Sequence, residues 1–166
     1  TCVTGLAVVD TGSHFSLFGQ LVILFLIQIG GLGIMTFSVS VALLLKKQVG
    51  MQREIAMQDV LDQEALASVK KLVLFLIKMT AGLELAGALF LFAAWIGRFP
   101  SIPKTAYYAF FHSVSAFCNA GFSPLSDSLT GMRSDWLTNV IICFLIIGGG
   151  MGFTVIKDVT DNFRDK

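Results

Sequence analysis

Two short segments of the sequence share a spacing that suits cation binding by the main chain. Each places a cysteine three residues before a glycine, in CVTGL at residues 2–6 and in CNAGF at residues 118–122. Glycine tolerates positive φ and carries no obstructing side chain, so carbonyl oxygens beside it can replace the water around an ion. Neither segment is charged, which favours a dehydrated monovalent cation. The candidate ion-binding residues are Val3, Thr4, Gly5, Asn119, Ala120 and Gly121.

The residue types give little support for a metal site, a disulfide framework, catalysis or nucleic-acid binding. Three cysteines without CxxC spacing give neither a disulfide framework nor a zinc site. His14 and His112 are too isolated to hold a metal. No paired catalytic carboxylates, HExxH or Ser/His/Asp set is visible, so we expect no catalytic residue and no cofactor. A net charge of +1 argues against a nucleic-acid partner.

The composition predicts that these segments lie in a lipid bilayer. The 166 residues are 55% hydrophobic and 14% charged, whereas a soluble domain is about 25% charged. A helix needs about 20 apolar residues to cross the hydrocarbon region. Three runs meet that need, at residues 18–45, 72–97 and 136–156. Because residue 1 is Thr and opens in the middle of a motif, we expect a piece of a longer membrane protein.

A fourth apolar run, at residues 104–117, is too short to span. Pro103 suits the start of a helix, and Gly121 suits its end. We interpret this run as a half-helix that enters the membrane and returns as an extended loop, which is tolerated where backbone lines a wet cavity. A short helix lying on the membrane surface is the alternative. The C-terminal end of such a half-helix carries partial negative charge, which favours a cation.

The two segments belong to an internal repeat. Each is followed by a polar loop and a spanning run that contains GGxG, at residues 30–33 and 149–152. We expect an all-α polytopic membrane protein, built from parallel repeats of helix, pore half-helix, filter loop and helix around a central pore. The glycines either let helices pack closely, which we favour, or let the inner helices bend. The predicted parts are an incomplete first repeat (1–45), a connector (46–71), a complete second repeat (72–156, with outer helix 72–97, half-helix 104–117, filter 118–122 and inner helix 136–156) and a tail (157–166).

The distribution of basic residues predicts the orientation. Basic side chains concentrate in residues 46–71 and 157–166, and such an excess marks the cytoplasmic side of a plasma-membrane protein. Both segments are therefore expected inside the cell. Residues 46–71 read either as an amphipathic helix at the inner face or as a solvated connector.

The sequence resembles the Trk/Ktr/HKT superfamily of potassium transporters, and in particular the bacterial membrane subunit of Ktr and Trk systems. The likeness covers nearly the whole chain. It is carried by VTGL at 3–6, VDTG at 9–12, FGQ at 18–20, IQIGGLGIMTF at 27–37, FHSVSAF at 111–117, NAGFS at 119–123 and GGMGFTV at 149–155.

The resemblance implies potassium transport by a multi-pass protein of the cell membrane. In that family four such units surround one pore, and Gly5 and Gly121 match the glycines of what look like the first and second filter segments. Glycine at these positions goes with preference for potassium, and serine in the first unit goes with sodium permeation. The resemblance also implies a homodimer on a cytosolic ring of nucleotide-binding regulatory subunits, and it leaves open coupling to sodium or protons.

Two further readings stay open. The first is a secondary transporter for another cation or a small solute, with half-helices lining its site, although such transporters favour inverted repeats. The second concerns Glu84, an ionisable residue in a predicted span. It should face the protein interior and be paired, and we expect a structural role rather than ion binding.

Overall fold

The computed structural model describes the backbone of residues 5, 8–49 and 58–151, and the side chains of residues 5, 8–33 and 73–151. The described residues contain helices and no strand, as the all-α prediction requires. Predictions about residues 1–4, 6–7, 50–57 and 152–166 lie outside the described residues. The elements are α1 (Thr11–His14), α2 (Leu17–Val49), α3 (Gln58–Trp95), α4 (Ile102–Phe117), a 3₁₀ turn η1 (Thr130–Met132) and α5 (Trp136–Gly150).

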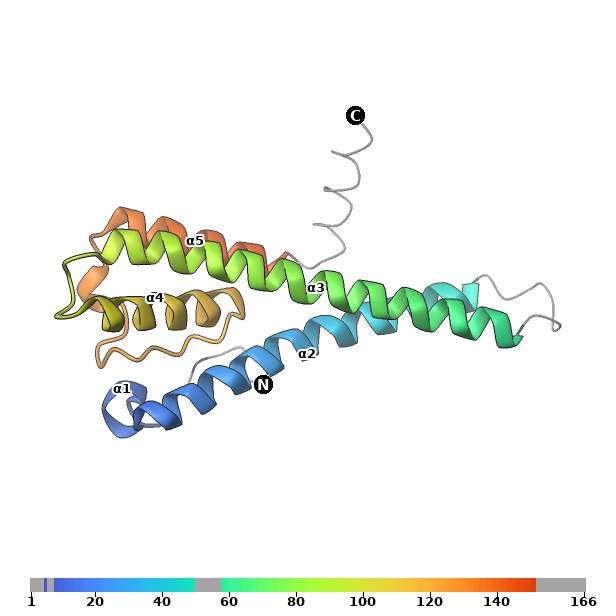
Figure 1. The fold of residues 1–166 in the computed structure, drawn as a ribbon, viewed down its shortest axis with the longest axis horizontal. Coiled ribbons are helices and arrows are strands. Elements are labelled where there is room, and N and C mark those ends of the chain that lie inside the picture. Colours follow the sequence, from blue (N-terminus) through green and yellow to red (C-terminus); the bar gives the residue numbers. More distant parts are fainter. Residues whose placement is uncertain (1–4, 6–7, 50–57, 152–166) are drawn as a thin grey trace, which may run out of the picture.

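Three helices form a bundle around α4. Figure 1 shows α5 lying along α3, with α4 packed beside both. After α4 the chain turns and runs back alongside it, to the end of the molecule where α4 begins. Helix α2 passes on the other side of this returning segment and then meets α3. The returning segment is therefore enclosed between α4 and α2.

The start and end of α4 follow from local sequence. Pro103 occupies the first turn, where a missing N–H costs no helical hydrogen bond. The helix ends at Phe117, and the backbone N–H of Cys118 bonds to the carbonyl of Val114. Gly121 has a φ of 72°, a left-handed conformation that stops a helix from resuming. The observed helix begins two residues before the predicted half-helix 104–117 and shares its last residue.

The two long helices extend beyond the predicted spans. Helix α2 continues to Val49, and α3 begins at Gln58 rather than at residue 72. Where they are described, the residues of the predicted connector 46–71 therefore continue these helices. Residues 58–71 hold no Pro or Gly and are rich in Gln, Glu, Ala, Lys and Leu, so nothing in them ends a helix. The division into repeats stays a prediction.

One helix among the described residues is long and apolar enough to cross a membrane, the part of α3 from Val73 to Trp95. Its 23 residues span about 35 Å at 1.5 Å per residue, against about 30 Å of hydrocarbon. Two shorter apolar helices, Leu17–Gly33 and Trp136–Gly150, coincide with described parts of the other two predicted spans.

Several polar side chains are buried together with the apolar core, while many large apolar side chains face outward. Thr80, Ser113 and Thr138 are at most 1% exposed, whereas Leu89 and Phe144 are 68% and 70% exposed. A soluble domain would reverse this distribution. The outer surface of the bundle therefore suits lipid or further apolar helices.

Candidate functional site

The segment after α4 adopts a backbone conformation that side chains seldom permit. Asn119 and Gly121 have φ values of 52° and 72°. Asn tolerates the left-handed region better than most residues, and Gly enters it without strain. With two left-handed residues so close together, the chain turns sharply at the end of α4 and then extends back beside it (Figure 1).

Hydrogen bonds from α4 hold this segment in place. The N–H of Ala120 donates to the carbonyl of Ser115 at 2.8 Å. The hydroxyl of Ser115 donates to the carbonyl of Phe122 at 2.7 Å. One residue of α4 thus holds the segment on both sides of Gly121, and the carbonyl of Phe122 is fixed toward α4. Ala120 and Ser115 are both 3% exposed, so water does not compete for these bonds.

His112 provides a second anchor for the returning segment. Its Nδ1 lies 2.7 Å from the carbonyl oxygen of Tyr108, which can only accept, so Nδ1 carries the proton. In the neutral ring Nε2 then accepts a hydrogen bond from the hydroxyl of Ser123, at 2.9 Å. The ring is 3% exposed and packs edge-on against Trp95. His112 thus packs against α3.

The two predicted ion-binding glycines lie against each other. Gly5 has a φ of 59°, like Gly121 in the left-handed region. A Cβ added to Gly5 would lie 2.6 Å from the carbonyl oxygen of Ala120 and 2.7 Å from the Cα of Gly121. Real Cβ atoms do not approach backbone this closely, so the two segments can touch here only because residue 5 is glycine. Gly5 and Gly121, 116 positions apart in sequence, thus form one surface, with the carbonyl oxygen of Ala120 at the contact.

Further close contacts join the first predicted repeat to the second. A Cβ added to Gly31 of α2 would lie 2.6 Å from the sulfur of Cys118. Near the start of α2, the hydroxyl of Tyr107 donates to the side-chain oxygen of Gln20 at 2.8 Å. The Nε2 of Gln20 in turn donates to the carbonyl of Phe15 at 3.0 Å. Helix α2 is therefore held to α4 and to the residue after it at two places along its length.

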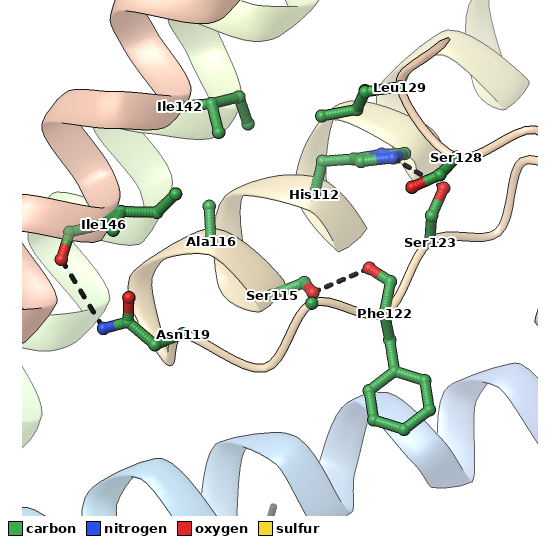
Figure 2. A pocket seen from close by; sticks show the side chains of 11 residues that line it. His112, Ser115, Ala116, Asn119, Phe122, Ser123, Ser128, Leu129, Ile142 and Ile146 are labelled. Carbon is green, nitrogen blue, oxygen red and sulfur yellow. Dashed lines mark hydrogen bonds between the residues drawn. The ribbon is translucent and has the colours of Figure 1, made fainter. Parts of the chain in front are cut away.

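A cavity of about 250 Å³ lies on the side of the returning segment that faces α5. Figure 2 shows it between α4, the returning segment and α5, with the side chains of His112, Ser115 and Asn119 along one wall. The Nδ2 of Asn119 donates to the carbonyl of Ile146 across its edge, at 3.5 Å. Gly121 also lines this cavity. Gly121 thus has the first predicted repeat on one side and open space on the other.

The electrostatics near the site favour a cation. The C-terminal end of the 16-residue helix α4 carries partial negative charge. The last turn of α4 contains no basic residue that would offset it. Outside the spanning helices, hydrogen bonds from the hydroxyl of Ser13 and the N–H of Gly12 lower the pKa of Asp10, so this carboxylate is ionised at neutral pH.

The predicted ion-binding residues fall into three groups. Gly5, Ala120 and Gly121 form the contact between the two segments. Asn119 directs its side chain to α5 and leaves only its backbone to the segment. Val3 and Thr4 lie outside the described residues. No group of three or more His, Cys, Asp or Glu side chains suited to a metal occurs among the residues described.

Sequence reasoning missed the supporting side chains. Ser115, Ser123 and Gln28 each bond to the returning segment or to a residue behind it. Their signal was present, because an uncharged polar residue in an apolar segment must find a partner. That signal does not say which partner it finds.

Comparison with known proteins gives a consistent result. Residues 1–163 match the family described as TrkH, cation transport protein. Ktr system potassium uptake protein B of Bacillus subtilis (strain 168) is 44% identical over 166 residues, which is all of this chain and 37% of that protein. The protein of the same name from Vibrio alginolyticus is 38% identical over 162 residues, 98% of this chain and 35% of that one. Potassium/sodium uptake protein NtpJ of Enterococcus hirae is 35% identical over 165 residues, 99% of this chain and 36% of that one.

These findings confirm the predicted resemblance and the prediction of an all-α membrane protein. The chain spans little more than a third of the length of these relatives, which are named as uptake proteins. The match covers the helices α1 to α5 and both glycine segments. The chain belongs to the TrkH family of cation transport proteins.

Proposed function

We propose that this chain supplies two of the filter segments through which a membrane protein takes up potassium ions. The observation that carries the proposal is the contact of Gly5 with Gly121, both left-handed, beside the carbonyl of Ala120. Carbonyl oxygens held in this way can replace the water shell of a potassium ion. Gly5, Ala120 and Gly121, with Val3, Thr4 and Asn119, are the proposed ion-binding residues.

The surroundings of the glycines support a filter. Ser115 and His112 fix the segment from behind, so its carbonyls need no reorganisation when an ion arrives. The negative end of α4 favours a cation at the same place. Two segments do not enclose an ion, so the complete pore requires further copies of the unit outside this chain. In the named relatives potassium uptake is the shared activity, and potassium is therefore the ion proposed here.

The arrangement of the whole protein is also part of the proposal. Residues 46–71 and 157–166 lie on the cytoplasmic side, where basic residues concentrate. The membrane subunit forms a homodimer and contacts a cytosolic ring of nucleotide-binding regulatory subunits through these segments. The names of two relatives refer to a Ktr system, which supports a protein that works with further components.

Potassium uptake is tested by expressing the full-length protein in a bacterium that lacks its own potassium uptake systems. We expect growth at low external potassium and uptake of potassium in cells that express the protein. An empty vector and a Gly121→Pro variant, which cannot adopt positive φ, are the controls. A full-length protein that reaches the membrane but restores neither growth nor uptake would contradict the proposal.

A further inference from the structure

Glu84 is an acidic residue in the middle of the one long apolar span among the described residues, Val73–Trp95. Its side chain is 5% exposed. An ionisable group at such a depth is unfavourable unless it is paired, so it calls for a specific role. Its partners belong to two other elements.

Both carboxylate oxygens of Glu84 accept hydrogen bonds. Oε2 accepts from the Nε2 of Gln28 on α2, at 3.1 Å. Oε1 accepts from the thiol of Cys118 at the end of α4, at 3.8 Å. The backbone carbonyl of the same residue accepts from the hydroxyl of Ser113 on α4, at 2.7 Å. Glu84 therefore links α2, α3 and α4 directly behind the segment that contains Gly121.

Cys118 transmits this link to the segment. It stands three residues before Gly121, and its side chain is 8% exposed. Gly31 of α2 lies against its sulfur so closely that an added Cβ would come within 2.6 Å. The thiol is therefore confined between Gly31 on one side and the Glu84 carboxylate on the other, and a shift of either moves the start of the segment.

Gln28 orients the carboxylate from the other repeat. Its Nε2 faces Glu84, while its Oε1 is buried without a hydrogen-bond partner among the described residues. The bond to Glu84 is thus the polar contact that sets the orientation of this amide. An unpartnered Oε1 also means that the amide can turn over and accept a hydrogen bond if the group opposite becomes a donor.

We propose that Glu84 is a positioning residue that sets ion selectivity, by holding the first repeat's α2 and the second repeat's filter segment in register through Gln28 and Cys118. The inference rests on the proposed function. Glu84 acts through its hydrogen bonds and does not touch the ion, because both of its oxygens are already engaged by protein donors.

Two substitutions separate hydrogen bonding from charge. Glu84→Leu keeps the approximate volume but removes both acceptors, and the potassium-to-sodium uptake ratio should fall about tenfold, the effect of losing buried hydrogen bonds. Glu84→Gln keeps one acceptor for the thiol of Cys118, and its new amide N–H can bond to the unpartnered Oε1 of Gln28. Its ratio should therefore stay within about twofold of the wild-type value.

The matched control is Thr80→Val. Thr80 lies one turn from Glu84 on α3, is 1% exposed, and its hydroxyl has no hydrogen-bond partner among the described residues. This change removes a buried polar group of the same helix without touching the link, so the uptake ratio should not change. Cys118→Ala should lower the ratio, and adding it to Glu84→Leu should cause little further loss, because the two residues act in one chain of contacts.

The experiment measures potassium and sodium uptake by the full-length protein in deficient cells, with the amount in the membrane determined for each variant. An unchanged ratio in Glu84→Leu overturns the inference. So does a Glu84→Gln variant as impaired as Glu84→Leu, because the charge would then be what matters. If Glu84→Leu does not reach the membrane, the test uses Gln28→Leu and Cys118→Ala instead. An unchanged potassium-to-sodium uptake ratio in both variants then overturns the inference. A wild-type protein without potassium uptake contradicts the proposed function itself, whereas normal wild-type uptake with unchanged variants contradicts only this inference.

Discussion

Gly5 and Gly121 are in contact, so that a Cβ on the first would lie 2.7 Å from the Cα of the second. Both have positive φ. The sequence places each glycine three residues after a cysteine in a repeated segment, and the fold brings the two copies together. A contact between equivalent positions of the two predicted repeats is what a pore at their interface requires.

The packing of α5 against α4 depends on Gly149. A Cβ there would collide with the carbonyl oxygen of Phe117 and lie 2.8 Å from its carbonyl carbon, and backbone cannot move aside. Gly149→Ala should therefore destabilise the protein by about 1–3 kcal/mol, as overpacking does. The measurement is thermal unfolding of the purified full-length protein.

The neighbouring glycine is the control for this prediction. Gly148 has no atom within 4 Å of an added Cβ. Gly148→Ala should be neutral, or should stabilise α5 by up to about 1 kcal/mol, since Ala is a better helix former. Equal losses of stability in the two variants would show that α5 does not lie on Phe117 as described.

Ser115 should control the affinity of the site for potassium. Ser115→Ala removes the hydroxyl that holds the carbonyl of Phe122 at 2.7 Å. Leaving the carbonyl of Phe122 without its partner costs about 1–3 kcal/mol of folding free energy. The carbonyl is then no longer held toward α4, and the shape of the segment changes. We expect a higher KM for potassium uptake with a smaller effect on the maximal rate.

Ser101→Ala is the matched change for Ser115→Ala. Ser101 precedes α4, and its side chain makes no capping hydrogen bond. Its removal should leave the KM unaltered. If both variants had the KM of the wild-type protein, the hydroxyl of Ser115 would have no part in shaping the segment.

A network between the end of α3 and the start of α5 predicts a dependence of stability on pH. The indole N–H of Trp95 donates to the hydroxyl of Thr138 at 2.8 Å, which donates to Asp135 at 2.6 Å. Arg98 pairs with the same carboxylate at 2.9 Å. The hydrogen bond from Thr138 and the charge of Arg98 lower the pKa of Asp135 below its usual value of 3.8.

Because the pKa of Asp135 is lower in the folded protein than in the unfolded one, the ionised carboxylate stabilises the fold when the pH is above the unfolded-state pKa. This stabilisation is lost as the pH falls through the folded-state pKa. The wild-type protein should therefore be more stable than Asp135→Asn at neutral pH, and the difference should shrink as pH falls below about 4. Thermal unfolding from pH 7 to pH 3 measures it. In a Thr138→Val background the dependence should be shallower, and a difference that grew toward acid pH would contradict the account.

The bounds of α4 and the equivalence of the Gly5 and Gly121 segments could be predicted because their signals are local or repeated. Pro103 and Gly121 mark the start of α4 and the turn beyond its end, and the observed helix Ile102–Phe117 follows them. The pairing of Gly5 with Gly121 follows from repeated sequence, which implies equivalent positions around an axis. Neither inference needs knowledge of individual side-chain contacts.

The length of α3 and the partners of Glu84 could not be predicted in this way. Hydropathy marks where a helix enters lipid, but α3 starts earlier because its polar residues are also helix formers. Gln28 and Cys118 lie 56 and 34 positions from Glu84 along the chain. Only the packing of α2 and α4 against α3 decides which buried polar groups meet.

The central claim is that Gly121 is part of a selectivity filter, and Gly121→Ser tests it. A side chain at a φ of 72° disturbs a backbone that only glycine adopts without strain. Gly97→Ser is the matched control, because Gly97 also has positive φ, at 81°, but nothing lies within 4 Å of an added Cβ.

The decisive measurement is the ratio of potassium to sodium uptake by full-length protein, with equal amounts of each variant in the membrane. Gly121→Ser should lower this ratio by about tenfold or more, which corresponds to about 1.4 kcal/mol of lost discrimination, while Gly97→Ser keeps the wild-type ratio. A Gly121→Ser protein that retains the wild-type ratio would contradict the account.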